Sequence, residues 1–174
     1  MKPETLENPT LKKQPVVFTP ETLLEHWQGH RRVSRRVLEV FPEDKLFTYS
    51  IGGMRTYAML TMEMIRLAVP GLQGAVTGKW ANMDDLFGEK APTPPTTKKE
   101  LLELWDKSTD MINQLWTQMR PQRFQEEEAA FGMFMGTITS SLFYLIDNEI
   151  HHRGQGYVYL RSLGIEPPAF WDRN

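Results

Sequence analysis

The chain has 174 residues, which is enough for one domain with a sizeable core. Lys and Arg total 20 against 22 Asp and Glu, so the formal net charge is only −2. This balance argues against a protein that wraps nucleic acid or binds an anionic membrane. Cysteine is absent, which excludes a disulfide scaffold, a thiolate zinc site and a cysteine nucleophile. Any chemistry must come from histidines, carboxylates, hydroxyls, amides or a bound group.

The N-terminal region predicts an arm followed by one domain. Residues 1–18 contain three prolines and lack the apolar stretch of a signal peptide, and the domain is expected over residues 19–174. No window approaches the roughly 18 uninterrupted apolar residues that a membrane-spanning helix needs. We therefore expect a soluble, cytoplasmic protein with no membrane partner.

The first predicted helix begins at Thr19-Pro20-Glu21, where a capping hydroxyl, a first-turn proline and an acidic residue coincide. Apolar residues then recur at helical spacing until Pro42 ends the run. Four arginines share one side of this helix: Arg31, Arg32, Arg35 and Arg36. Such a cluster could grip a phosphate, but in a nearly neutral chain it is more often solvated, so we expect it on the outer face.

The second predicted helix runs from Met54 to about Val69, because its pattern is apolar on most sides and Pro70-Gly71 should end it. Residues 71–97 follow as a long connection rich in glycine and proline. The third predicted helix covers Lys98 to about Met119.

The last predicted helix follows an acidic stretch and runs from about Thr137 to Leu163, with Gly164 at the position of a C-terminal cap. No strand-like alternation competes with these helices. The pattern therefore predicts an all-α protein, an up-down four-helix bundle with a long connection between the second and third helices.

A polar group on the apolar faces is the candidate site. Asn148 and His152 are four residues apart on the apolar face of the last helix, so both project into the bundle. Glu63 interrupts the apolar second helix, where an unpaired charge is costly to bury. Bundles build metal sites from polar side chains on facing helices, so these three are candidate metal ligands. The alternative is a metal-free polar pair of Glu63 with His152 or an arginine.

A second histidine pair, His26 and His30, also has the spacing of metal ligands. No carboxylate of the same helix completes a site there, so we expect this pair to be structural or exposed to solvent.

Several motifs carry a family resemblance. The run His151-His152-Arg153-Gly154-Gln155, followed by Tyr159-Leu160-Arg161 and Pro167-Pro168, resembles the C-terminal signature of the DinB-like (YfiT-related) family. The stretch from Met54 to Tyr57 that leads to Glu63 is also similar to that family. The resemblance covers the chain from about residue 20, and it implies a four-helix bundle that is commonly homodimeric.

The resemblance also implies chemistry. Family members typically hold a divalent metal with three histidines, and several transfer or isomerise small molecules with a low-molecular-weight thiol such as bacillithiol, mycothiol or glutathione. Here the ligand positions fall on Glu63, Asn148 and His152, and only His152 keeps the histidine. One nitrogen and two oxygens should suit Fe, Mn or Mg better than Zn or Ni, and should bind all of them more weakly.

Two functions follow from this resemblance. The first is a metal-dependent hydrolase or transferase, in which the ion activates a thiol toward an electrophilic small molecule and Arg153 or Tyr57 orients the substrate. The second is a degenerate, metal-free bundle that binds a small molecule or dimerises. The family's association with DNA damage and stress describes expression, so we expect no nucleic-acid partner.

Overall fold

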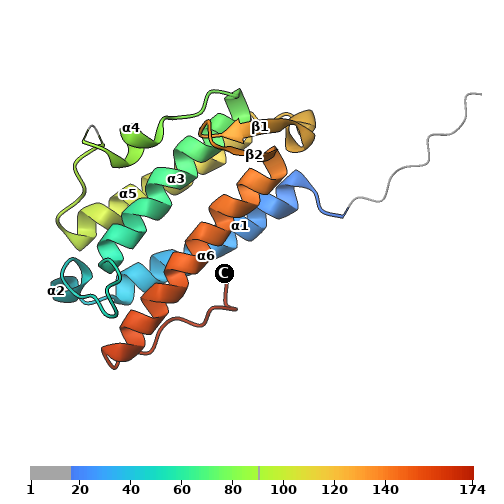
Figure 1. The fold of residues 1–174 in the computed structure, drawn as a ribbon. Coiled ribbons are helices and arrows are strands. Elements are labelled where there is room, and N and C mark those ends of the chain that lie inside the picture. Colours follow the sequence, from blue (N-terminus) through green and yellow to red (C-terminus); the bar gives the residue numbers. More distant parts are fainter. Residues whose placement is uncertain (1–16, 90) are drawn as a thin grey trace, which may run out of the picture.

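The computed structural model describes residues 17–89 and 91–174, and four long helices of these ranges form a bundle (Figure 1). The long helices are α1 (Pro20–Val40), α3 (Tyr57–Thr77), α5 (Lys98–Trp116) and α6 (Ile138–Ser162). The shorter elements are α2 (Glu43–Leu46), α4 (Met83–Phe87), the 3-10 helix η1 (Pro121–Gln125) and the strands β1 (Glu127–Ala130) and β2 (Phe134–Thr137). The mainly helical fold is confirmed, whereas nearly all of the predicted arm, residues 1–18, lies outside the described residues.

Each long helix begins at a threonine whose hydroxyl accepts a hydrogen bond from a backbone N–H in the first turn. These capping residues are Thr19, Thr56, Thr97 and Thr137. At the start of α5 the cap is reciprocal, because the Glu100 side chain also accepts from the Thr97 backbone. The helix starts are thus encoded locally.

The predicted end of the second helix is wrong. Helix α3 continues through Pro70 for another two turns, to Thr77. A proline inside a helix costs one hydrogen bond, but Leu72 and Ala75 beyond it are fully buried in the core. Gly71 lets α6 approach closely, since a Cβ there would lie 2.8 Å from the Leu145 side chain. Packing against α6 therefore outweighs the local stop signal.

The directions of the four helices differ from a simple up-down order. Helices α1 and α6 run in parallel, and both are antiparallel to α3 and α5, which therefore run in the same direction (Figure 1). The pairs that fix these directions are Phe18–Phe143 and Phe41–Tyr159 for α1 with α6, Glu63–His152 and Gly71–Leu145 for α3 with α6, and Gln28–Asn113 and Arg35–Asp106 for α1 with α5. The long connection between α3 and α5 is confirmed, and it returns the chain along the bundle so that two parallel helices can follow one another.

The acidic stretch before the last helix forms a small hairpin, which the sequence did not predict. Strands β1 and β2 pair antiparallel over four residues each, through a turn at Phe131 and Gly132 that both have positive φ. Glu128 of β1 pairs with Arg123 and accepts from the indole of Trp80 at 2.9 Å. These contacts attach the hairpin to the bundle. The sequence did not reveal the strands because four residues are too few to show an alternation of apolar and polar side chains.

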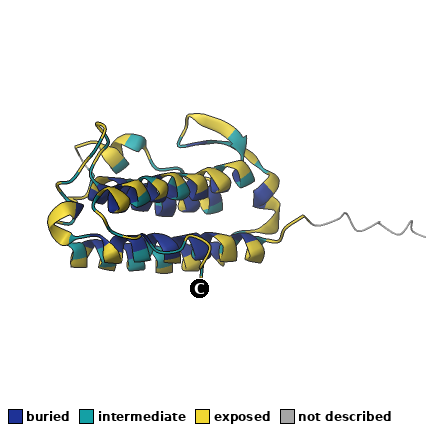
Figure 2. Ribbon diagram, turned by 90° about the horizontal axis from the view of Figure 1, so that it is seen from below, coloured by how far each residue is buried: buried dark blue, intermediate teal, exposed yellow. Residues whose placement is uncertain are grey.

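The core lies between the helices, whose inward faces are buried along their whole length (Figure 2). One cluster at the hairpin end contains Trp27, Leu72 and Leu142, and a second at the opposite end contains Phe41, Tyr57 and Tyr159. The polar residues discussed below lie between these clusters. Within the described ranges, no helix is both long and apolar enough to cross a membrane.

Candidate functional site

Glu63, Asn148 and His152 come together as the sequence predicts. Glu63 lies on α3 and the other two lie one turn apart on α6. Oε1 of Glu63 is 3.0 Å from Nε2 of His152 and accepts a hydrogen bond from Nδ2 of Asn148 at 3.4 Å. One carboxylate oxygen is thus the meeting point of all three side chains.

Arg55, just before α3, holds the other oxygen of the same carboxylate. Its guanidinium forms an ion pair with Oε2 of Glu63, and the Arg55 side chain is 46% exposed against 19% for Glu63. Partial burial of Glu63 raises its pKa, but the hydrogen bonds from His152 and Arg55 outweigh this and lower the pKa below its ordinary value. Glu63 is therefore a carboxylate at neutral pH.

Gln155 orients the imidazole of His152. Its Oε1 lies 2.7 Å from Nδ1, which donates to it in this arrangement. A neutral ring then has no proton on Nε2, so two acceptors, Nε2 and Oε1 of Glu63, face each other. Either a second proton on the ring or a cation between the two atoms removes this conflict.

The side-chain amide of Asn148 has one unused hydrogen-bond acceptor. Its Oδ1 is buried and has no hydrogen-bond partner among the described residues. Rotating the amide by half a turn would exchange Nδ2 for Oδ1 and direct three acceptors, one nitrogen and two oxygens, to the same point. This donor set fits a hard divalent ion.

The fit has two limits. Within residues 17–89 and 91–174, no three His, Asp or Glu side chains gather closely enough to hold a metal, so such a site depends on the Asn148 amide. Arg55 also places a positive charge on the only carboxylate of the set. The residues present therefore fit a divalent ion held weakly, with coordination positions left for water or substrate.

Glu63, but neither Asn148 nor His152, lines a groove along α3. Two adjoining cavities of about 440 and 530 Å³ share Arg55, Glu63 and Phe87 in their walls. Phe87 belongs to α4 in the long connection, which covers this side of α3. Most of the remaining lining is apolar, and Arg66 and Asp84 add further charges, so a small molecule here would meet apolar walls with charged groups at a few points.

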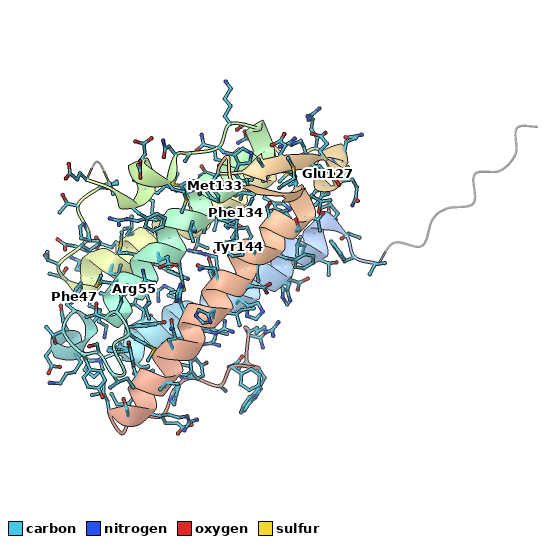
Figure 3. The ribbon with its side chains drawn as sticks, in the orientation of Figure 1. Phe47, Arg55, Glu127, Met133, Phe134 and Tyr144 are labelled. Carbon is cyan, nitrogen blue, oxygen red and sulfur yellow. The ribbon has the colours of Figure 1, made fainter. Side chains whose placement is uncertain are left out.

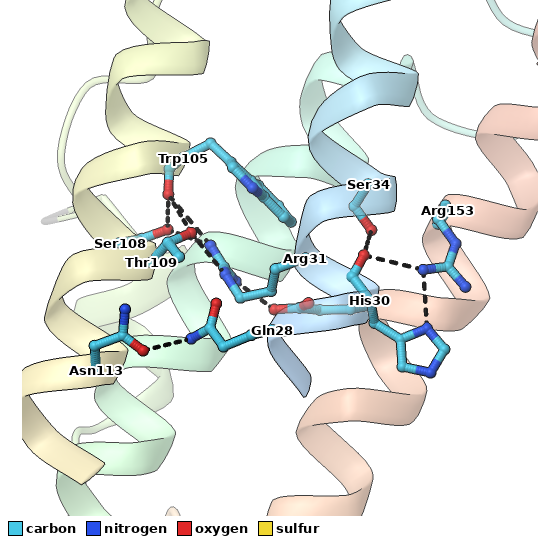
Figure 4. Close-up of polar contacts among 10 residues, drawn as sticks. Gln28, His30, Arg31, Ser34, Trp105, Ser108, Thr109, Asn113 and Arg153 are labelled. Carbon is cyan, nitrogen blue, oxygen red and sulfur yellow. Dashed lines mark hydrogen bonds and ion pairs between the residues drawn. The ribbon is translucent and has the colours of Figure 1, made fainter. Parts of the chain in front are cut away.

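The two residues expected to orient substrate lie elsewhere. Arg153 is 5% exposed and points to α1, where NH1 lies 3.0 Å from Nδ1 of His30 and donates to the His30 carbonyl at 3.1 Å (Figure 4). Tyr57 is fully buried and stacks on Phe41, and its hydroxyl has no hydrogen-bond partner among the described residues. The structure does not bring either to the Glu63–His152 pair.

An interior ion pair was missed by the sequence reasoning. Arg31 of α1 and Glu149 of α6 are each 1% exposed, and their side chains meet at 2.5 Å. Arg31 also donates to Ser108 and Thr109 of α5 and lies over the Trp105 ring, 4.0 Å from its centroid (Figure 4). Burial raises the pKa of Glu149, and the charge of Arg31 opposes that shift. The spacing of Arg31 and Glu149 on their own helices gave no signal, because the pair joins different helices.

The prediction that the arginine cluster lies on the outer face is wrong for Arg31, whereas Arg32 is exposed and Arg35 and Arg36 are partly exposed. Arg31 is inside the bundle, and Arg35 binds Asp106 of α5 through two hydrogen bonds. Arg32 and Arg36 donate to backbone carbonyls of the C-terminal segment at residues 172–174. Through these contacts the four arginines link α1 to α5, α6 and the C-terminal segment.

The histidine pair His26 and His30 is structural or exposed, as predicted: His26 is exposed, and His30 is buried against Arg153.

Comparison with known proteins gives the family. The model of the DinB family matches residues 10–173, so the chain belongs to the DinB family. Two solved structures share the fold with a TM-score of 0.68 and 19% sequence identity: a DinB-like protein from Bacillus cereus, over 86% of this chain and 95% of that one, and the DinB-like protein YjoA from Bacillus subtilis, over 85% and 96%. No curated protein matches the chain significantly.

Proposed function

We propose that this DinB protein is a metal-assisted hydrolase or transferase whose small electrophilic substrate lies in the groove above Glu63. The observation that carries the proposal is the convergence of His152 and Asn148 on one oxygen of Glu63, with the acceptor Oδ1 of Asn148 buried and unpartnered. Turning the amide would bring that acceptor to the point where Oε1 of Glu63 and Nε2 of His152 already meet, which completes a set of three ligand atoms.

Each residue has a distinct part in this proposal. Glu63, His152 and Asn148 would hold the ion, with Fe and Mn favoured over Zn and Ni by the oxygen-rich donor set. When bound, such an ion lowers the pKa of a coordinated thiol or water and so supplies a nucleophile at neutral pH. Gln155 keeps Nε2 of His152 directed at the site. Arg55 is half exposed, so it can turn from Glu63 toward an anionic group of the substrate.

A thiol, where one is used, must be brought by a cosubstrate. The chain has no cysteine, so a low-molecular-weight thiol such as bacillithiol would supply the sulfur. The apolar walls of the groove would then hold the electrophile and limit the access of water.

A second candidate is a metal-free bundle that binds a small molecule or dimerises. The observation that favours it is that both oxygens of Glu63 already have protein partners, with Arg55 on one and His152 on the other. In this case a doubly protonated His152 balances Glu63, and Glu63→Gln changes stability and little else. The homodimer that the family resemblance implies stays a prediction for both candidates.

Metal analysis of the full chain, purified without an affinity tag, separates the two candidates. The first predicts a stoichiometric divalent ion, or its recovery when Fe, Mn, Zn or Ni is added to chelator-treated protein. Absence of an ion together with no recovery for any of the four would overturn it and leave the metal-free bundle.

A further inference from the structure

A partly open apolar cavity lies between the hairpin, Trp80 and the first half of α6, beyond the groove just described. Its volume is about 180 Å³, and its walls are almost entirely apolar. The walls include Trp80, Ala130, Met135 and Leu145. An apolar cavity of about 150 Å³ is large enough to bind benzene, so this cavity accommodates a group of that size.

The two serine hydroxyls of the cavity wall are already hydrogen-bonded within α6 and its cap. Ser140 and Ser141 line the cavity, but both hydroxyls donate to the carbonyl of Thr137. No charged side chain belongs to the lining. Among the side-chain hydroxyls of the lining, that of Tyr144 alone has no hydrogen bond within the described residues, so the cavity favours an apolar group and offers a polar partner at Tyr144 only.

The cavity adjoins the groove above Glu63. Phe131, Phe134 and Tyr144 line both the cavity and the part of the groove that Glu63 and Arg55 also line. Figure 3 shows Phe134 and Tyr144 close together at the hairpin end, with Arg55 farther along the same face.

The same face of α6 joins the cavity to the polar site. Tyr144, Asn148 and His152 follow at intervals of four residues, so they lie one above another. One turn separates Tyr144 from Asn148, which is about 6 Å along the helix. The apolar cavity and the polar cluster are thus within the reach of one small molecule.

We propose that the cavity is a specificity subsite that takes a phenyl ring or a branched alkyl group of similar size. The substrate is then an amphiphilic small molecule with an apolar end under the hairpin and its reacting group at Glu63, roughly one to two helical turns away. The position of the reacting group rests on the proposed function, whereas the apolar subsite does not. The side chains of Phe134 and Met135 are 58% and 75% exposed, so the cavity is open to a ligand on the hairpin side.

Benzene is the probe for the subsite, and methyl NMR of the full chain is the measurement. In wild-type protein, benzene should shift the methyl resonances of Met135, Ala130 and Leu145 in a saturable way, and leave methyls at the other end of the bundle, such as that of Ala58, unchanged. Ser141→Leu, which fills the cavity, should weaken benzene binding at least about tenfold. Ser141→Ala removes the same hydroxyl without filling the cavity and should bind within about twofold of wild type.

Two results would overturn the subsite. One is wild-type protein whose Met135, Ala130 and Leu145 methyls do not respond to benzene, a measurement that needs no variant to fold. The other is Ser141→Leu that melts like wild type and binds benzene equally well. Metal titration of the same samples keeps the two proposals apart. A protein that binds metal but not benzene rejects only the subsite. A protein that binds benzene but none of the metals rejects only the metal-assisted function.

Discussion

Glu63 and His152, 89 positions apart in the chain, bring Oε1 and Nε2 within 3.0 Å between α3 and α6. Oε1 of Gln155 accepts a hydrogen bond from Nδ1, the other ring nitrogen of His152, and this contact fixes the orientation of the ring toward Glu63. What lies between these two atoms, a proton or a metal ion, distinguishes the two functional candidates. The same geometry makes the neighbouring Arg55 a competitor for any ion at this place.

Replacing Arg55 should therefore strengthen metal binding. In Arg55→Gln the carboxylate of Glu63 loses a positive neighbour, and a half-exposed pair of this kind is worth about 0.5 to 1 kcal/mol. We expect the affinity for Mn²⁺ to rise by about two- to fivefold, measured by calorimetric titration. Arg120→Gln, at an exposed position just before η1, serves as the control and should leave the affinity unchanged. Weaker binding in Arg55→Gln would show that the arginine supports the ion instead.

Gly156 should tolerate no side chain, although Gly154 on the same helix should. A Cβ at Gly156 would lie 2.4 Å from the buried Tyr57 ring, whereas at Gly154 nothing lies within 4 Å. We expect Gly156→Ala to lower the free energy of unfolding by about 1–3 kcal/mol. Gly154→Ala should raise it by about 0.5–1 kcal/mol, since alanine favours the helix. Urea denaturation measures both, and equal effects at the two positions would contradict the close approach of α3 and α6.

Breaking the interior ion pair should be costly. Glu149→Leu leaves Arg31 buried without a countercharge, which typically lowers the free energy of unfolding by about 3–5 kcal/mol. The exposed pair of Arg161 and Glu166 is the matched control, and Glu166→Leu should cost less than about 1 kcal/mol. Thermal melting compares the variants. Similar melting temperatures for both would mean that Arg31 reaches solvent or another partner.

His30 should make stability depend on pH. Burial, and then the positive charges of Arg153, Arg173 and His26, lower the pKa of His30 from about 6.5 to about 3 in the folded state. Between these values the unfolded chain binds a proton that the folded chain does not, so stability falls as pH falls below about 6.5. Above that pH the contribution is constant.

The slope due to His30 reaches at most about 1.4 kcal/mol per pH unit. His30→Gln keeps an acceptor for Arg153 and should flatten the dependence of the unfolding free energy between pH 6.5 and 4, measured in urea. His151→Gln, at an exposed position, should keep the wild-type slope. An unchanged slope in His30→Gln would mean that His30 takes up a proton in the folded protein.

The sequence predicted the polar site because its signals are local. Asn148 and His152 share a helical face through their spacing, and Glu63 is a charge in an apolar pattern. Thr19 and Pro20 likewise marked the start of the first helix. These features depend on residues within a few positions of one another, and the structure confirms that the three side chains meet.

The features that sequence reasoning missed depend on packing between distant segments. Pro70 is a local stop signal that burial of Leu72 and Ala75 overrides. Arg31 resembles its exposed neighbours until α5 and α6 enclose it. The parallel direction of α3 and α5 also has no local signal, since the connection is long enough for either direction.

Titration of Mn²⁺ into chelator-treated, tag-free protein tests the metal site most directly, with wild type, Glu63→Gln and the exposed control Glu25→Gln compared side by side. We expect one ion per chain for wild type and Glu25→Gln, and a loss of affinity of at least about tenfold for Glu63→Gln, which removes the only charged ligand of the three. Equal binding by all three proteins, or no binding by wild type, would contradict a metal site at Glu63, Asn148 and His152.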